Sequence, residues 1–159
     1  MALIGIKGKD HAVNTWLITY AIRHTPSLVL DCANHANPHC LPIETPLEAL
    51  QQTYVVNIDL IYMLRDILLH APYIARRRGA QCVIITTFRT LFHYSDKDEN
   101  KDIYEHAWEL MAALGEEYDV IVGIRGQEEY AQKHCDRILE GIDGAHRLEP
   151  THRIRHHPR

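Results

Sequence analysis

The sequence predicts a three-layer α/β fold, with helices on both faces of a mostly parallel sheet that ends in an antiparallel strand pair. Apolar runs of strand length alternate with apolar residues at helical spacing along the chain. The clearest run, 81–88, is continuous and rich in β-branched residues, as expected of a strand buried on both faces. Alternating strands and helices favour parallel pairing with right-handed crossovers.

The first half of the chain supplies three strands and two helices. The expected elements are a strand at 2–8, a helix from about Val13 to Arg23, strands at 27–32 and 53–58, and a helix over Leu60–Leu68. Turn-forming residues up to Pro38 end the strand at 27–32. Pro72 is expected to kink or restart the last helix, because proline cannot donate its backbone hydrogen bond.

The second half continues the alternation. The strand at 81–88 is followed by a polar loop at 93–101 and a helix whose apolar face runs from Ile103 to Leu114, near Gly115. Another buried strand is expected at 118–124. The segment 136–150 is predicted to form two strands around an Asp-Gly turn, which gives the terminal antiparallel pair.

Composition indicates one ordinary globular domain over residues 1–159. The chain has 159 residues, of which 46% are hydrophobic and 24% charged. It has neither the apolar run of a membrane span nor a signal-peptide profile, so a cytoplasmic protein is expected. The four cysteines are then expected to be reduced, with Cys82 and Cys135 serving as small core residues.

Charge is spread unevenly along the chain. The net charge is −4 and the sequence pI is about 6.3, so the whole protein has no field that attracts nucleic acid. The segment 146–159 is nevertheless basic, with four arginines against one glutamate. This C-terminal segment is therefore the first place to expect contact with a polyanion.

Residues 8–15 lie between the first strand and the first helix, where a phosphate-binding loop would lie. Their spacing fits G-x-x-x-x-G-K-[ST], with Gly8 and Thr15 in place. Taken in order, the segments 3–22, 28–41, 82–124 and 135–159 resemble the ATPase core of the RecA family, most closely archaeal RadB-like paralogues. The resemblance implies a RecA-like fold with a degenerate nucleotide site.

Three requirements of the family's ATPase chemistry fail together. In the phosphate-binding loop, Val13 replaces a glycine and Asn14 replaces the lysine that reaches the phosphates. Thr86 stands where the strand at 81–88 should carry the aspartate that holds magnesium. Ala33 stands where the resemblance places the acid that orients the attacking water. These residues indicate a pseudo-ATPase that needs no cofactor.

Two polar residues of these motifs have simpler interpretations. The Thr15 hydroxyl is expected to cap the first helix rather than to serve a nucleotide. Asp31 is either a polar strand end or a residue with an inherited function.

A different interpretation comes from the cluster Cys32, His35, His39 and Cys40. Four such side chains can bind Zn²⁺ tetrahedrally, and His11 is a possible substitute for one of them. The spacing matches no common zinc motif, and adjacent His39 and Cys40 would diverge in an extended segment. A small zinc-binding protein or metal-dependent enzyme is therefore an alternative to the pseudo-ATPase.

The two loops that contact DNA in active recombinases carry little positive charge here. The first, 93–101, is more acidic than basic, and the second, 125–134, has balanced charges. In the tail, Arg153 and Arg155 keep the spacing of a basic pair that reaches the neighbouring subunit's ATP in the RecA family. The alternative for this pair is a disordered basic C-terminus.

The leading hypothesis is a non-catalytic, RadB-like accessory protein in DNA recombination or repair. Its expected partner is a RecA-family recombinase or another DNA-repair protein, in a possible hetero-oligomer, with DNA contacted only weakly or indirectly. A DNA-binding accessory subunit acting through the basic tail is a further alternative.

Overall fold

The structure is a computed structural model that describes residues 1–36, 44–88, 91, 97–125, 128–142 and 149–153. In chain order the elements are β1 (Leu3–Gly8), α1 (Asp10–Arg23), β2 (Ser27–Asp31), α2 (Leu47–Gln51), β3 (Thr53–Asn57), α3 (Ile61–Arg78), β4 (Cys82–Ile85), α4 (Lys97–Leu114), β5 (Asp119–Ile124), α5 (Glu128–His134), β6 (Arg137–Ile142) and β7 (Glu149–Arg153).

The strands form one sheet in the order β3-β2-β4-β5-β1-β6-β7. Strands β1 to β6 pair in parallel, and β7 pairs antiparallel with β6. The first strand of the chain therefore lies inside the sheet, between β5 and β6. The predicted parallel sheet with an antiparallel end is confirmed.

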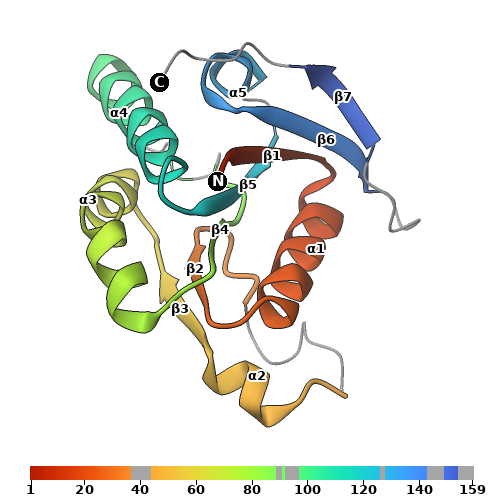
Figure 1. The fold of residues 1–159 in the computed structure, drawn as a ribbon. Coiled ribbons are helices and arrows are strands. Elements are labelled where there is room, and N and C mark those ends of the chain that lie inside the picture. Colours follow the sequence, from red (N-terminus) through yellow and green to blue (C-terminus); the bar gives the residue numbers. More distant parts are fainter. Residues whose placement is uncertain (37–43, 89–90, 92–96, 126–127, 143–148, 154–159) are drawn as a thin grey trace.

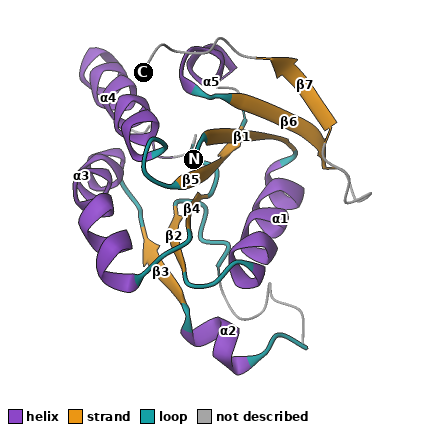
Figure 2. Ribbon diagram, in the orientation of Figure 1, coloured by secondary structure: helices purple, strands orange, loops and turns teal. Residues whose placement is uncertain are grey.

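Helices cover the two faces of the sheet unequally (Figures 1 and 2). Helix α1 packs on one face, where Val13, Leu17 and Ala21 are buried against the side chains of β1, β2, β4 and β5. Helices α3 and α4 pack on the other face and against each other, and α5 packs against α4. Trp108 of α4 is the largest side chain that is fully buried there. The sheet thus separates two hydrophobic cores, as a three-layer fold requires.

Several predicted boundaries were wrong. Helix α1 begins at Asp10 rather than near Val13, and α4 begins at Lys97, inside the segment predicted as a loop. The residues by which the helices exceed the prediction, 10–12 in α1 and 97–101 in α4, are mostly polar, so the apolar pattern does not detect them. Helix α3 runs from Ile61 to Arg78 without a break at Pro72.

Two short helices were missed and one strand was shifted. Helix α2 has no buried residue, and α5 lies within the segment 125–134 that was predicted as a loop. Strand β7 reaches Arg153, three residues beyond the predicted end. No helix in the described ranges is long and apolar enough to span a lipid bilayer.

Candidate functional site

The carboxyl ends of the parallel strands carry the residues that the sequence singled out. In an open parallel sheet, ligands bind at this edge, where connections leave neighbouring strands toward opposite faces. The chain after β1 enters α1 on one face, whereas the chains after β4 and β5 lead to α4 and α5 on the other (Figure 1). The edge near β1, β4 and β5 is therefore where a nucleotide site is to be sought.

The connection from β1 to α1 is too short to form a phosphate-binding loop. Strand β1 ends at Gly8, and α1 begins at Asp10, with Lys9 as its N-cap. The segment that would have to wrap a phosphate is thus the first turn of the helix, with the Val13 N–H bonded to the Lys9 carbonyl at 2.9 Å. Gly79 is the only described glycine with a positive φ, so Gly8 does not supply the left-handed conformation that makes such loops glycine-rich.

Asn14 fills the position where the resemblance expects a lysine. Its side chain is 2% exposed and faces the end of β4. The Asn14 Nδ2 donates to the Thr87 Oγ1 at 2.9 Å, and the Thr87 backbone N–H donates to the Asn14 Oδ1 at 3.0 Å. This reciprocal pair joins α1 to the chain after β4, and each partner satisfies the other's buried polar groups.

Val13 and Asp10, both in the first turn of α1, also have their side chains engaged within the protein. Val13 is fully buried in the core under α1. Asp10 stands in the first turn of α1 and forms an ion pair with Arg125 at 3.1 Å, just beyond β5. The helix N-terminus, which would attract a phosphate, thus already carries a carboxylate.

Asp31 organises the chain that follows β2. Its Oδ1 accepts hydrogen bonds from the N–H groups of Ala33 and His35, at 3.3 and 3.1 Å, and its Oδ2 accepts from the Ala36 N–H at 2.8 Å. The carboxylate is 2% exposed. Of the two interpretations of Asp31, this geometry supports the structural one, because its oxygens bind the protein's own backbone.

Thr86 holds the same segment from β4. Its hydroxyl donates to the Asp31 Oδ1 at 3.1 Å and accepts from the Cys32 and Ala33 N–H groups at 2.7 and 3.1 Å. One donor and two acceptor positions exhaust the capacity of a hydroxyl group. Thr86 and Ala33, the two degenerate acid positions, are therefore brought together, but as part of a buried hydrogen-bond network.

Thr15 lies within α1 and is not its cap, so that interpretation was wrong. Its Oγ1 is 3.0 Å from the His35 Nε2. His11, one turn earlier on α1, places its ring edge-on to the His35 ring, with centroids 5.1 Å apart. His35 therefore packs on α1, and the segment after β2 is held from both sides.

The proposed zinc ligands are only partly described. His39 and Cys40 lie outside the described residues. Cys32 is buried in the core on the α3 and α4 side, whereas His35 contacts α1. Burial raises the pKa of the Cys32 thiol well above its usual value, and the neighbouring Asp31 raises it further. Within the described ranges, no three His, Cys, Asp or Glu side chains gather as metal ligands.

A cleft of about 300 Å³ opens beside this network, at the ends of β2 and β3. It is lined by Asp31, Cys32, Ala33, Asn34, Asn57, Ile58, Asp59 and Leu91. Asn34, Asn57 and Asp59 are exposed, so the cleft offers amide and carboxylate groups to solvent. Asn57 and Asp59 were not singled out from the sequence, although a polar residue at the end of an apolar strand and one shortly after it are the signal that marks them.

The remaining candidates lie far along the chain. Arg153 ends β7, but its side chain and the whole of Arg155 lie outside what the structure describes. Their action on a partner's nucleotide stays a prediction. Cys82 and Cys135 are buried, as predicted.

The pair His11 and His35 predicts a pH dependence. Burial lowers the pKa of His35, the nearby His11 lowers it further, and Asp31 opposes both. The pKa of His35 in the folded protein therefore lies below its value of about 6.5 in the unfolded chain. As the pH falls below about 6.5, the unfolded chain binds the proton first. The contribution of neutral His35 to the free energy of unfolding is thus present above that pH and lost below it. Changing His11→Asn is expected to raise the His35 pKa, measured by NMR titration of the imidazole protons. His70→Asn is the control, because His70 does not contact His35. An unchanged His35 pKa in His11→Asn, or an equal rise of the His35 pKa in His70→Asn, would contradict this prediction.

Comparison with known proteins identifies the fold. No protein-family model and no curated protein matches the chain. Among solved structures, 127 chains match. One is a KaiC-like protein from the hyperthermophilic archaeon Pyrococcus horikoshii, with a TM-score of 0.63 over 93% of this chain and 74% of that chain, at 8% identity. The predicted RecA-like fold is thus confirmed, and a likeness at this identity carries no further than the fold.

Proposed function

We propose that this chain is a RecA-like protein that has lost nucleotide binding and acts as a protein-binding accessory factor. The observation that carries the proposal is the reciprocal hydrogen-bond pair between Asn14 and Thr87. The resemblance to the RecA family puts the lysine that reaches the phosphates at residue 14, and here the side chain of that residue is bonded to Thr87. In keeping with the resemblance to RadB-like paralogues, we place its partner among RecA-family recombinases or other DNA-repair proteins.

Two further features support the loss of nucleotide binding. Helix α1 starts directly after Lys9, so no loop is left whose N–H groups could surround a phosphate. The positions that would hold magnesium and orient water, Thr86 and Ala33, are tied to Asp31 and to each other. A hydroxyl group with all its hydrogen bonds made has no remaining capacity for a metal-bound water.

Exposed apolar side chains support a role in protein binding. Leu47 of α2 is 68% exposed, and Leu60 and Leu69, at and within α3, are each about half exposed. Large exposed apolar side chains are one feature of interaction sites, so Leu47, Leu60 and Leu69 are candidate contacts with a partner.

The test is calorimetric titration of the purified full-length chain with MgATP. We expect no heat of binding at nucleotide concentrations up to about 1 mM, which corresponds to a binding free energy weaker than about −4 kcal/mol. A stoichiometric complex with micromolar Kd would overturn the loss of nucleotide binding. For the accessory role, adding the chain to a purified RecA-family ATPase from the same organism is expected to change that enzyme's ATP turnover, and unchanged turnover argues against it.

A further inference from the structure

Three consecutive arginines, Arg76 to Arg78, end helix α3, and all three are exposed. Arginines at such positions commonly stabilise the last carbonyls of a helix. Here the backbone does so: Gly79, with φ of 65°, donates to the Arg76 carbonyl at 3.2 Å, and the Ala80 N–H donates to the Ala75 carbonyl at 2.9 Å. The helix end is therefore capped without the arginine side chains.

Tyrosine side chains hold two of the three guanidinium groups. The Arg77 Nη1 donates to the Tyr73 hydroxyl at 3.0 Å, and the Arg78 guanidinium lies 4.0 Å from the centroid of the Tyr54 ring. Tyr73 is 58% exposed and Tyr54 is 37% exposed. No carboxylate of the described residues forms an ion pair with these arginines. Their charges are thus uncompensated, and two of them are ordered beside exposed aromatic rings.

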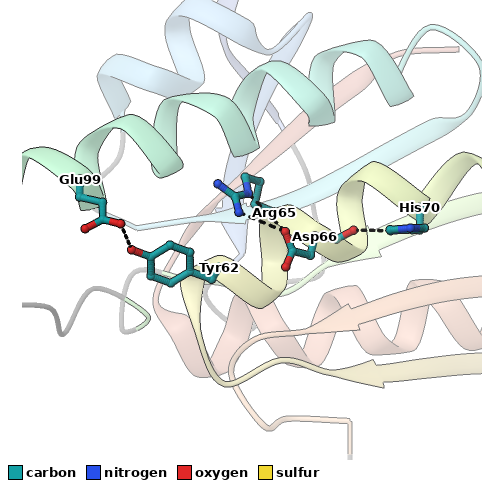
Figure 3. A network of polar contacts seen from close by, with 5 residues as sticks. All are labelled: Tyr62, Arg65, Asp66, His70 and Glu99. Carbon is teal, nitrogen blue, oxygen red and sulfur yellow. Dashed lines mark hydrogen bonds and ion pairs between the residues drawn. The ribbon is translucent and has the colours of Figure 1, made fainter.

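The first half of α3 is different. Figure 3 shows Arg65 paired with Asp66, at 3.2 Å, and Tyr62 donating to Glu99 of the neighbouring helix α4. Charges and hydroxyl groups in this half are matched within the protein. The positive charge of the helix is therefore concentrated at its C-terminal end.

We infer that this Arg–Tyr patch (Tyr54, Tyr73 and Arg76 to Arg78) binds single-stranded nucleic acid. Guanidinium groups suit phosphate oxygens, and exposed rings stack on unpaired bases, whereas the stacked bases of a duplex offer no free face. The patch lies at the amino edge of the sheet, because α3 leads directly into β4. It is thus separate from the candidate site, and it requires neither a nucleotide nor the protein partner proposed above.

Fluorescence anisotropy of the full-length chain with a labelled 20-nucleotide dT strand tests this inference. Changing Arg76, Arg77 and Arg78 together to Gln is expected to raise Kd at least about tenfold at low salt, and to reduce the slope of log Kd against log salt concentration by about 2. The matched control changes Lys9, Lys101 and Arg137 to Gln. Lys9 is the N-cap of α1, Lys101 lies on α4 and Arg137 on β6, and all three are exposed. The control removes the same charge and is expected to change Kd less than about threefold.

The tyrosines separate stacking from general charge attraction. Tyr73→Leu is expected to weaken binding about tenfold, whereas Tyr73→Phe, which keeps the ring and loses only the hydrogen bond to Arg77, is expected to weaken it less than about threefold. Equal effects of the two triple variants would overturn the inference, because net charge alone would then explain binding. Absence of dT binding at low salt would overturn the inference as well. Binding to vesicles rich in phosphatidylserine without binding to dT would overturn it in the same way.

Discussion

Replacing Asp31 by alanine is expected to lower the free energy of unfolding by about 3 to 5 kcal/mol. The carboxylate accepts hydrogen bonds from three backbone N–H groups and from the Thr86 hydroxyl. Alanine leaves the N–H groups of His35 and Ala36 without their acceptors, in a region that is partly shielded from water. Urea unfolding of both proteins, compared through midpoint and slope, measures the loss.

A second substitution at Asp31 distinguishes the two carboxylate oxygens. Asp31→Asn keeps one oxygen for the three bonds now made to Oδ1, but sets an NH₂ group against the Ala36 N–H. We expect an intermediate loss of about 1 to 2 kcal/mol. Asp59→Ala is the matched control, because Asp59 lines the same cleft but is exposed, and its loss should stay within about 0.5 kcal/mol. Equal losses at Asp31 and Asp59 would show that the network does not depend on the Asp31 carboxylate.

The sequence predicted the sheet well because buried parallel strands leave a direct pattern. The residues of β4 are all buried, and so are those of β2, and both were found as apolar runs. Helix α2 could not be found in this way, since none of its residues is buried. The early starts of α1 and α4 were not predicted for a related reason: residues 10–12 and 97–101 are mostly polar and give no apolar periodicity.

For the candidate site, the sequence predicts a degenerate nucleotide site but not the contacts that its residues make. Val13, Asn14, Ala33 and Thr86 differ from the residue types that the resemblance places in an ATPase, and that difference is visible in a single sequence. The partnerships are not visible, because Asn14 and Thr87 are 73 residues apart and Asp31 and Thr86 are 55 residues apart. They depend on β4 lying beside β2 and under α1, which only the sheet order determines.

The two networks have the same consequence at the carboxyl edge of the sheet. One joins α1 to the chain after β4, and the other joins the chain after β2 to β4. Both use short polar side chains that are buried and hydrogen-bonded to each other or to the backbone, and such networks are costly to disturb in a protein interior. An edge that holds a nucleotide in an ATPase would thus serve here as a rigid part of the scaffold.

The substitution Asn14→Lys restores the residue expected of a phosphate-binding loop. We expect it to destabilise the protein by about 3 to 5 kcal/mol and to give no affinity for MgATP. The lysine would lose both hydrogen bonds to Thr87 and would carry a charge into a side-chain site that is 2% exposed. Urea unfolding and calorimetric titration measure the two effects.

Arg23→Lys is the control, because it places a lysine in the same helix at an exposed position and is expected to change stability by no more than about 0.5 kcal/mol. A stable Asn14→Lys protein that binds MgATP with micromolar Kd would contradict the prediction. Such binding would require the first turn of α1 to unwind into a loop around the phosphates. The side chain of residue 14 would then be the only obstacle to nucleotide binding in the wild-type protein. If the lysine variant is instead destabilised and still binds no nucleotide, the obstacle also includes the helical backbone from Asp10 to Val13, which a single side chain cannot restore to a loop.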